Sequence, residues 1–422
     1  AQCQAGSCGI ACFSGYHACG TPAQCLSNTS VASCGTRCTP CAVPANGYAT
    51  CDGTDCGFAC YQGYVKVGTK CEPLWQNVPL RAPTGLTGVY TEITALHGRD
   101  VSKGDVLVGA TFRQTNNTSR YFIVSAVSGR PSAWLDSPAY ALFVLPRDKY
   151  DIQWTWAGFQ NDKLGLYQWG APHGQWTLNA GNAWGTIRSI WASSDYNSYV
   201  VGDTVDPNRG ILWHPNQSDD ACEWTYSVVA SETDNSGGFS TIREDRQGGF
   251  FLEHNSLVYA SPDRDGPWTK GAKACSLPNN KLCWSTSSLE VNTDGALIIV
   301  GFELRDTQPY FRSYVWRSTN RGATWITLWQ VDDVVLNAVA AAGQHLFAGG
   351  RGWNDNMLFH SSNGGATWTN ESPTISQLNN YRYEATHMWT DANKTVYVAG
   401  QKKLLSAPST PDEAFIWRRR SW

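Results

Sequence analysis

The residue types that could perform chemistry in this chain are carboxylates, histidines, tyrosines and arginines near the ends of short apolar stretches. Glycoside hydrolysis needs two carboxylates on opposite loops, and elimination from a polysaccharide needs a histidine or tyrosine base beside a positive charge. Arginine and aromatic side chains supply planar hydrogen-bond donors and stacking faces, which suit sugars. The catalytic candidates are Glu253, His254, Glu303, Asp306, Tyr381 and Glu384. The ligand-binding candidates are Trp184, Trp284, Arg305, Arg312, Arg351, Trp353 and Arg382.

Other chemistries lack their residue patterns. The eight histidines show no HExxH or HxH spacing, and no GxSxG, phosphate-loop or dinucleotide motif occurs, so neither a metal site nor a cofactor is predicted. A net charge of −3 argues against nucleic acid or an anionic membrane surface as partner. No apolar run of about 18 residues occurs, so no transmembrane helix is predicted.

Two independent anchors divide residues 87–422 into seven units and predict an all-β, seven-bladed β-propeller. Each anchor recurs about every 48 residues, as expected when one repeat forms one four-stranded blade. The first anchor is a tryptophan after a polar turn, predicted to begin a fourth strand: Trp134, Trp176, Trp224, Trp268, Trp325, Trp368 and Trp417. The second is a glycine that ends an apolar strand: Gly109, Gly158, Gly202, Gly301, Gly349 and Gly400, with Glu253 in a degenerate copy.

A closed ring would bring the candidate residues together. Loops from second to third strands, and loops that enter the inner strands, converge on one face around the central channel. Residues 75–78 resemble one further fourth strand and are a candidate to pair with the last blade. Glu253 and His254 stand where the other repeats place glycine, and such departures are candidates for function. The favoured interpretation is structural, with the fourth blade tolerating a bulge.

The cysteines separate the N-terminal part from the rest. Twelve of the 15 lie within residues 3–71, where few large apolar side chains occur, so they predict a disulfide framework in an oxidising compartment. A zinc module is disfavoured because His17 is the only histidine there. We expect a disulfide module over residues 1–72, a linker over 73–86 and the propeller over 87–422. Of the later cysteines, Cys275 and Cys283 are the closer pair, and Cys222 is the candidate free thiol.

The module repeats itself, because residues 3–16 match residues 51–64. Residues 41–71 resemble the cysteine-rich repeats of secreted myxobacterial proteins and, faintly, complement-control modules. The first resemblance implies an extracellular accessory module without a particular activity. The start of the sequence within this segment, with no apolar leader, favours a mature secreted protein.

Two turns carry a family resemblance. Residues 318–325 and 361–368 resemble the Asp-box, S-x-D-x-G-x-T-W, with Asn in place of Asp, and residues 261–268 form a degenerate copy. We expect each to join a third strand to a fourth, with the Asn side chain bonding the turn backbone. The resemblance is to Asp-box propellers, which include sialidases, xyloglucan-degrading hydrolases, sorting receptors, photosystem assembly factors and lectins. It implies the fold and not the chemistry.

The sialidase interpretation needs three arginines for a carboxylate, an Arg-Ile-Pro element and a Tyr–Glu nucleophile pair. Arg-Ile-Pro is absent. Arg312, Arg351 and Arg382 could form the cluster and Tyr381 or Tyr383 could approach Glu384, but nothing in the sequence fixes that arrangement. The preferred hypothesis is a secreted propeller that binds a glycan or a cell-surface protein. The alternatives are a polysaccharide-degrading hydrolase or lyase and a non-catalytic protein-interaction propeller.

Overall fold

The computed structural model of the chain divides into two compact units, Ala1–Gln76 and Asn77–Trp422. Every regular element among the described residues is a β-strand, which confirms the all-β fold. In the described part of the chain no helix is long and apolar enough to cross a membrane. The structure describes residues 2–4, 7–9, 11–98, 106–145, 154–160, 163–168, 171–177, 186–194, 197–202, 209–215, 224–231, 238–254, 256–264, 266–275, 283–352, 357–373, 381–391, 394–407 and 410–419.

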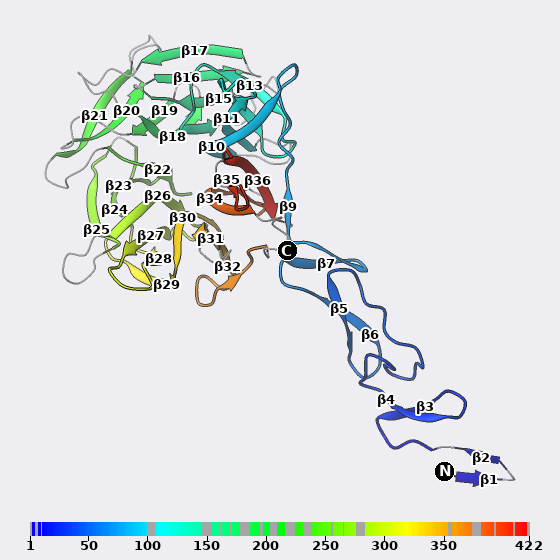
Figure 1. Cartoon of the computed structure of the whole chain (residues 1–422). Helices are drawn as coiled ribbons and strands as arrows, with labels where there is room; N and C mark the ends of the chain where they lie inside the picture. Colours follow the sequence, from blue (N-terminus) through cyan, green and yellow to red (C-terminus); the bar gives the residue numbers. More distant parts are fainter. Residues whose placement is uncertain are drawn as a thin grey trace. The chain divides into compact units, whose positions relative to one another are not determined.

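Seven four-stranded antiparallel sheets form the second unit, and they confirm the seven-bladed propeller (Figure 1). Blade one consists of β10 (Gly88–Gly98), β11 (Val106–Gln114), β12 (Ser119–Ser125) and β13 (Pro131–Leu135). Blade two consists of β14 (Ala141–Val144), β15 (Trp154–Gly158), β16 (Lys163–Gln168) and β17 (Ala171–Thr177). Blade three consists of β18 (Ile187–Ser194), β19 (Asn197–Gly202), β20 (Arg209–Pro215) and β21 (Trp224–Ser231). Blade four consists of β22 (Thr241–Glu244), β23 (Phe250–His254), β24 (Leu257–Ser261) and β25 (Thr269–Lys273). Blade five consists of β26 (Cys283–Val291), β27 (Leu297–Leu304), β28 (Phe311–Ser318) and β29 (Ile326–Asp332). Blade six consists of β30 (Val334–Ala342), β31 (His345–Gly352), β32 (Leu358–Ser361) and β33 (Thr369–Asn370).

Blade seven closes the ring with a strand that precedes the propeller in sequence. It consists of β34 (Tyr381–Thr390), β35 (Val396–Leu404), β36 (Glu413–Arg419) and, as its fourth strand, β9 (Trp75–Asn77). The amide of Val78 donates to the carbonyl oxygen of Ile416 at 2.9 Å. The pairing predicted for residues 75–78 is therefore confirmed. The last tryptophan anchor was misplaced, because Trp417 lies in the third strand β36.

The apolar core lies between neighbouring blades. Trp156 of blade two and Ile187 and Trp213 of blade three are at most 2% exposed and share one cluster. Burying one such side chain is worth roughly 2 kcal/mol, and the contact recurs around the ring. Strand pairing runs within each sheet, and only isolated hydrogen bonds such as Ile187 N to Phe159 O cross between blades, so side-chain packing contributes most to holding the ring.

The two turns predicted from the Asp-box pattern have the same hydrogen bonds. In the first, Gly322 N donates to Ser318 Oγ at 2.9 Å, and Thr324 N donates to Asn320 Oδ1 at 2.9 Å. In the second, the equivalent bonds within residues 361–367 measure 2.8 and 2.9 Å. Both turns join a third strand to a fourth, as expected.

Five inner strands pair irregularly with their second strand. In β26 the register shifts between Ser285 and Leu289. The other four each carry one extra residue at the corresponding point of the strand: Thr94 in β10, Arg188 in β18, Asn337 in β30 and Thr386 in β34. The strands β10 and β18 are irregular at a second point as well. Such a bulge bends the strand and redirects its side chains. It explains two of the repeat glycines, Gly202 and Gly400, and also Gly350 beside the repeat position Gly349, because the strand carbonyl next to the bulge would meet a Cβ atom. A Cβ would lie 2.2 Å from that carbonyl oxygen at Gly202 and 1.9 Å from it at both Gly350 and Gly400.

Blade four departs from this pattern in a way the sequence did not predict. Its inner strand pairs without an extra residue, with Thr241 opposite Glu253 and Ile242 opposite Leu252. No bulge is present at Glu253 and His254, where one was expected; the bulge of this blade lies between β24 and β25, near Leu257 and Tyr259. Glu253 replaces the glycine where no bulge is present, so no neighbouring carbonyl excludes its side chain.

Four short hairpins make up the described part of the first unit: β1 (Gln2–Gln4) with β2 (Ser7–Gly9), β3 (Tyr16–Cys19) with β4 (Gln24–Ser27), β5 (Gly47–Cys51) with β6 (Cys56–Cys60), and β7 (Tyr64–Val67) with β8 (Lys70–Pro73). The predicted disulfide framework is confirmed by the bonds Cys12–Cys25, Cys19–Cys38, Cys34–Cys51, Cys41–Cys56 and Cys60–Cys71. Overlapping crosslinks of this kind replace a hydrophobic core. Cys275 in the propeller is also disulfide-bonded, and Cys222 lies outside the described residues.

Candidate functional site

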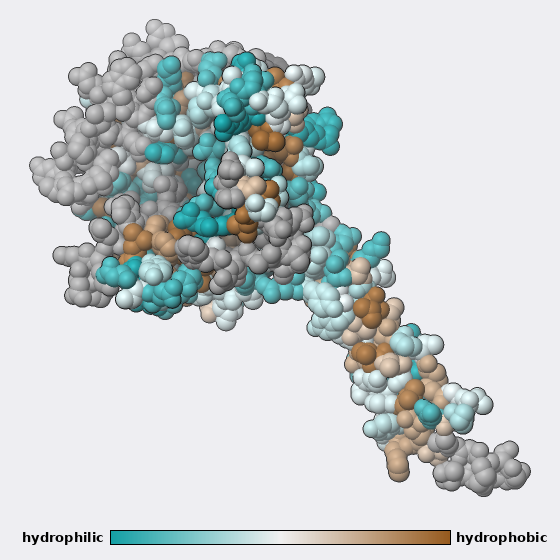
Figure 2. Space-filling model, in the orientation of Figure 1, coloured by the Kyte–Doolittle hydropathy of each residue, from teal (hydrophilic) through white to brown (hydrophobic). Residues whose placement is uncertain are grey.

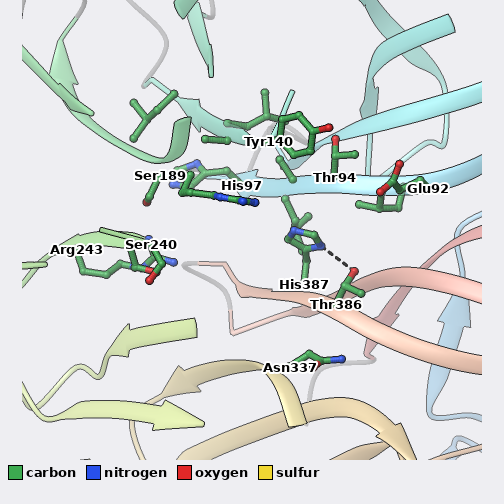
Figure 3. A pocket seen from close by; sticks show the side chains of 18 of the residues that line it. Glu92, Thr94, His97, Tyr140, Ser189, Ser240, Arg243, Asn337, Thr386 and His387 are labelled. Carbon is green, nitrogen blue, oxygen red and sulfur yellow. Dashed lines mark hydrogen bonds between the residues drawn. The ribbon is translucent and has the colours of Figure 1, made fainter. Parts of the chain in front are cut away.

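A cavity of about 510 Å³ lies between the inner strands of six blades. Figure 3 shows Glu92, Thr94 and Tyr140 on one side of it and Ser189, Ser240 and Arg243 on the opposite side. All four bulge residues line this cavity. The bulges therefore place polar side chains on a surface that regular inner strands would line with alternating core residues. The polar groups are Glu92, Thr94, His97, Tyr140, Arg188, Ser189, Ser240, Thr241, Arg243, Asn337, Thr386, His387 and Gln401.

The charges in and beside the cavity are mixed. Glu92 is the only carboxylate among the described lining residues. Burial is the main cause of the raised pKa of Tyr140; Glu92 raises it further and Arg188 opposes the shift. Gln160 Nε2 donates to Tyr140 Oη at 3.2 Å. These interactions join a carboxylate, a phenol and a guanidinium at one end of the inner strands.

Arg243 and His387, which also line the cavity, are held by neighbouring groups. Arg243 Nε lies 3.7 Å from Glu290 Oε2, and burial raises the pKa of that carboxyl. Burial lowers the pKa of His387 to about 4, so its imidazole is neutral at neutral pH. His387 Nδ1 and Thr386 Oγ1 are 2.8 Å apart, as the dashed line in Figure 3 shows. The cavity thus offers donors and acceptors with little net charge.

Glu253 and His254 hold the loop that enters blade four. The Glu253 side chain is fully buried, and its Oε1 accepts a hydrogen bond from Ser256 N at 2.8 Å. Its Oε2 accepts a hydrogen bond from Ser240 Oγ. His254 Nδ1 lies 2.8 Å from Gly238 O. Glu253 therefore positions Ser240, which lines the cavity, and does not itself line it.

Several rim candidates lie in local ion pairs. Glu303 lies 3.2 Å from Arg305 Nε, and Asp306 is exposed on the following turn. Tyr381 Oη donates to Glu413 Oε1 at 3.4 Å, and Lys402 lies 4.4 Å from the centre of the Tyr381 ring.

Glu384 connects the cavity to a neighbouring small pocket. Asn337 Nδ2 donates to its Oε1 at 3.1 Å, and Arg351 Nη1 lies 3.6 Å from its Oε2. Arg351 and Arg382 line the small pocket, of about 120 Å³. Arg312 is bound bidentately by Asp332, at 2.6 and 3.1 Å. Two of the three arginines considered for a sialidase thus share a pocket.

The aromatic candidates lie mostly beyond what the structure describes. Trp184 and Trp353 are outside the described residues. Trp284 lies in β26, where only its backbone is described. The sequence interpretation also overlooked Glu92, Arg188, Asn337 and His387. The signal that points to three of the inner-strand bulges is the glycine opposite them: Gly202, Gly350 and Gly400.

Comparison with known proteins adds no family. No family model matches the chain, and no curated protein is similar to it in sequence. The Asp-box and myxobacterial patterns therefore remain resemblances. Among solved structures, the chain is similar to YCF48 bound to a D1 peptide, with 10% identity, a TM-score of 0.47, and coverage of 83% of this chain and 96% of that chain. The chain is also similar to the WD40 β-propeller domain of Doa1, with 10% identity, a TM-score of 0.47, and coverage of 82% of this chain and 97% of that chain. A chain of a mitotic checkpoint complex is similar as well, with 11% identity, a TM-score of 0.43, and coverage of 82% of this chain and 95% of that chain.

Proposed function

We propose that this protein is a secreted binding protein whose propeller takes a glycan in the central cavity. The observation that carries the proposal is one cavity of about 510 Å³ lined by hydroxyl, amide, guanidinium and carboxylate groups from six blades. Small-molecule sites have volumes of this order and a few convergent polar groups. Sugar hydroxyls both donate and accept hydrogen bonds, so a lining of mixed donors and acceptors with little net charge suits them.

The arrangement supports binding over hydrolysis. A two-carboxylate glycosidase places its carboxyl groups about 5–10 Å apart across the scissile bond. Glu92 has no second carboxylate beside it among the described lining residues. Glu253, Glu303 and Glu384 already accept hydrogen bonds or form ion pairs with protein groups.

Secretion is supported by the first unit. Five disulfides within residues 12–71 persist in an oxidising compartment and are rare in a reducing one.

The test is a glycan array followed by calorimetry with the full chain. We expect one glycan class to bind, and Arg188→Ala to weaken it about tenfold or more, because a charge-assisted hydrogen bond is lost. Arg246→Ala, an exposed arginine in the turn between β22 and β23, is the matched control and should bind normally. Release of sugar products would support the hydrolase or lyase instead. Absence of any glycan ligand, with capture of a cell-surface protein, would support the interaction role.

A further inference from the structure

The disulfide-rich unit exposes its aromatic rings. Phe13 is 88% exposed, and Tyr16, Tyr48 and Tyr61 are 49–54% exposed. Seven of the fourteen exposed large hydrophobic side chains in the described chain belong to this unit, which holds 76 of the 422 residues. In Figure 2 brown atoms recur along its surface. Apolar rings that are exposed side by side mark a binding surface, whereas single exposed apolar side chains do not.

Two of these rings are presented by the same local structure. Tyr16 N donates to Phe13 O at 3.0 Å, and Tyr64 N donates to Tyr61 O at 3.1 Å. Each turn contains a glycine with positive φ, 84° at Gly15 and 83° at Gly63. A side chain at either glycine would be strained, so both turns require this residue.

Disulfides fix both turns. Phe13 follows Cys12, which is bonded to Cys25, and Tyr61 follows Cys60, which is bonded to Cys71. The rings therefore stand on crosslinked backbone, and a ligand that contacts them orders little additional chain. Pre-organisation of this kind strengthens binding without adding contacts.

The second turn has a companion ring. The rings of Tyr48 and Tyr61 lie 5.9 Å apart between centroids, with 37° between their planes. Tyr48 lies in β5, opposite Ala59, so the hairpin of β5 and β6 holds it beside the turn. Two half-exposed rings at this spacing form a platform wider than one ring.

The charge of the unit argues against a strongly charged occupant. Residues 1–76 contain three basic and three acidic side chains, Arg37, Lys66, Lys70, Asp52, Asp55 and Glu72, so their net charge is zero. Such a surface does not attract an anionic polymer or an anionic membrane. The apolar C–H faces of uncharged sugar rings complement uncharged aromatic rings.

We propose that the disulfide-rich unit binds an uncharged polysaccharide, whose sugar rings stack on Phe13 and on the Tyr48–Tyr61 platform. This site is independent of the propeller cavity. It would hold the protein on an insoluble polymer while the propeller binds its own ligand.

The test is co-sedimentation of the full chain with microcrystalline cellulose and, separately, with chitin. We expect at least one polymer to sediment the protein, and F13A/Y61A to reduce the affinity about tenfold or more. Val43→Ala removes an apolar side chain that is 69% exposed in the same unit, and Tyr61→Phe keeps the ring; both should sediment normally. Binding should persist in 1 M NaCl, because no ion pair contributes.

Four results would overturn the proposal: sedimentation with neither polymer, equal sedimentation of the double variant, loss of binding in salt, or a dimer of the wild type that the double variant lacks. Disulfide mapping of the double variant confirms that its framework is intact. Arg188→Ala should sediment normally, so failure of this site and failure of the propeller site are measured separately.

Discussion

A Cβ atom on Gly350 would lie 1.9 Å from the carbonyl oxygen of Val335. That close approach exists because the inner strand of blade six carries Asn337 as an extra residue. The glycine on one strand and the cavity-lining amide on the other are therefore two sides of one structural feature. The same relationship recurs at Gly202 in blade three and at Gly400 in blade seven, so in these three blades the second-strand glycine and the polar cavity residue depend on each other.

Replacing Gly350 tests this relationship. We expect Gly350→Ala to lower the free energy of unfolding by about 3 kcal/mol or more, because the backbone of the neighbouring strand must move. Gly349→Ala is the matched control: its Cβ would meet Met388 Sδ at 2.8 Å and Ala385 Cβ at 3.1 Å, and it should cost less because none of its three nearest atoms is backbone. Urea unfolding of both variants measures the difference. Equal costs would show that the bulge does not require the glycine.

Glu253 should behave as a structural residue. Glu253→Gln keeps the volume but turns one acceptor oxygen into an NH₂ group. With the amide oxygen still accepting from Ser256 N, the Ser240 hydroxyl must accept from the NH₂ group and donate to the backbone carbonyl of residue 253 instead. Rearranging one buried hydrogen bond costs about 1 kcal/mol, so we expect a lower unfolding midpoint. Glu303→Gln is the rim control, with a smaller expected loss. Unchanged stability together with lost turnover would instead identify Glu253 as a catalytic group.

The lowered pKa of His387 predicts that the propeller loses stability at acid pH. Burial lowers its pKa from 6.5 to about 4, so the unfolded chain binds a proton over a pH range where the folded chain does not. Stability therefore falls as pH decreases from 6.5 toward 4, by roughly 3 kcal/mol over the full window. The lowered pKa of His345, caused mainly by burial, acts in the same direction. Unfolding curves at pH 7 and pH 4.5 measure the loss, and His387→Gln should reduce it. An equal loss in that variant would assign the sensitivity to other groups.

The ring could be predicted from the sequence and the cavity could not, for physical reasons. Tryptophans and glycines repeat because each blade repeats the same contacts, and residues 75–78 share the fourth-strand pattern, so the fold and its closure were predictable. The bulges were not, because an extra residue shifts which side chains face the channel without changing composition. Hydrogen-bond partners could not be predicted either, because Asn337 and Glu384 come from different blades and their hydrogen bond exists only in the closed ring.

Glu371 should act as an electrostatic link between blades six and seven. Burial would raise its pKa, but hydrogen bonds from Arg419 and His360 lower it. Arg419 is 7% exposed and binds both Glu371 oxygens, at 2.8 and 2.7 Å. Glu371→Gln leaves a buried guanidinium without its carboxylate, and we expect a loss of about 3–5 kcal/mol. Asp412→Asn removes the exposed pair with Lys403 and should cost less than about 1 kcal/mol. Comparable unfolding midpoints for the two variants would contradict this assignment.

Pairing of β9 with β36 should stabilise the closed ring. Val78 N donates to Ile416 O, and the Val78 side chain is 4% exposed in a cluster with Ile416. Val78→Ala removes side-chain packing alone, whereas Val78→Pro also removes the donor. We expect the proline variant to cost about 2 kcal/mol or more beyond the alanine variant. Amides of β36 should then exchange faster with deuterium, because their neighbouring strand is displaced. If the two variants unfold at the same denaturant concentration and β36 remains protected in both, the propeller does not depend on β9 to stay closed.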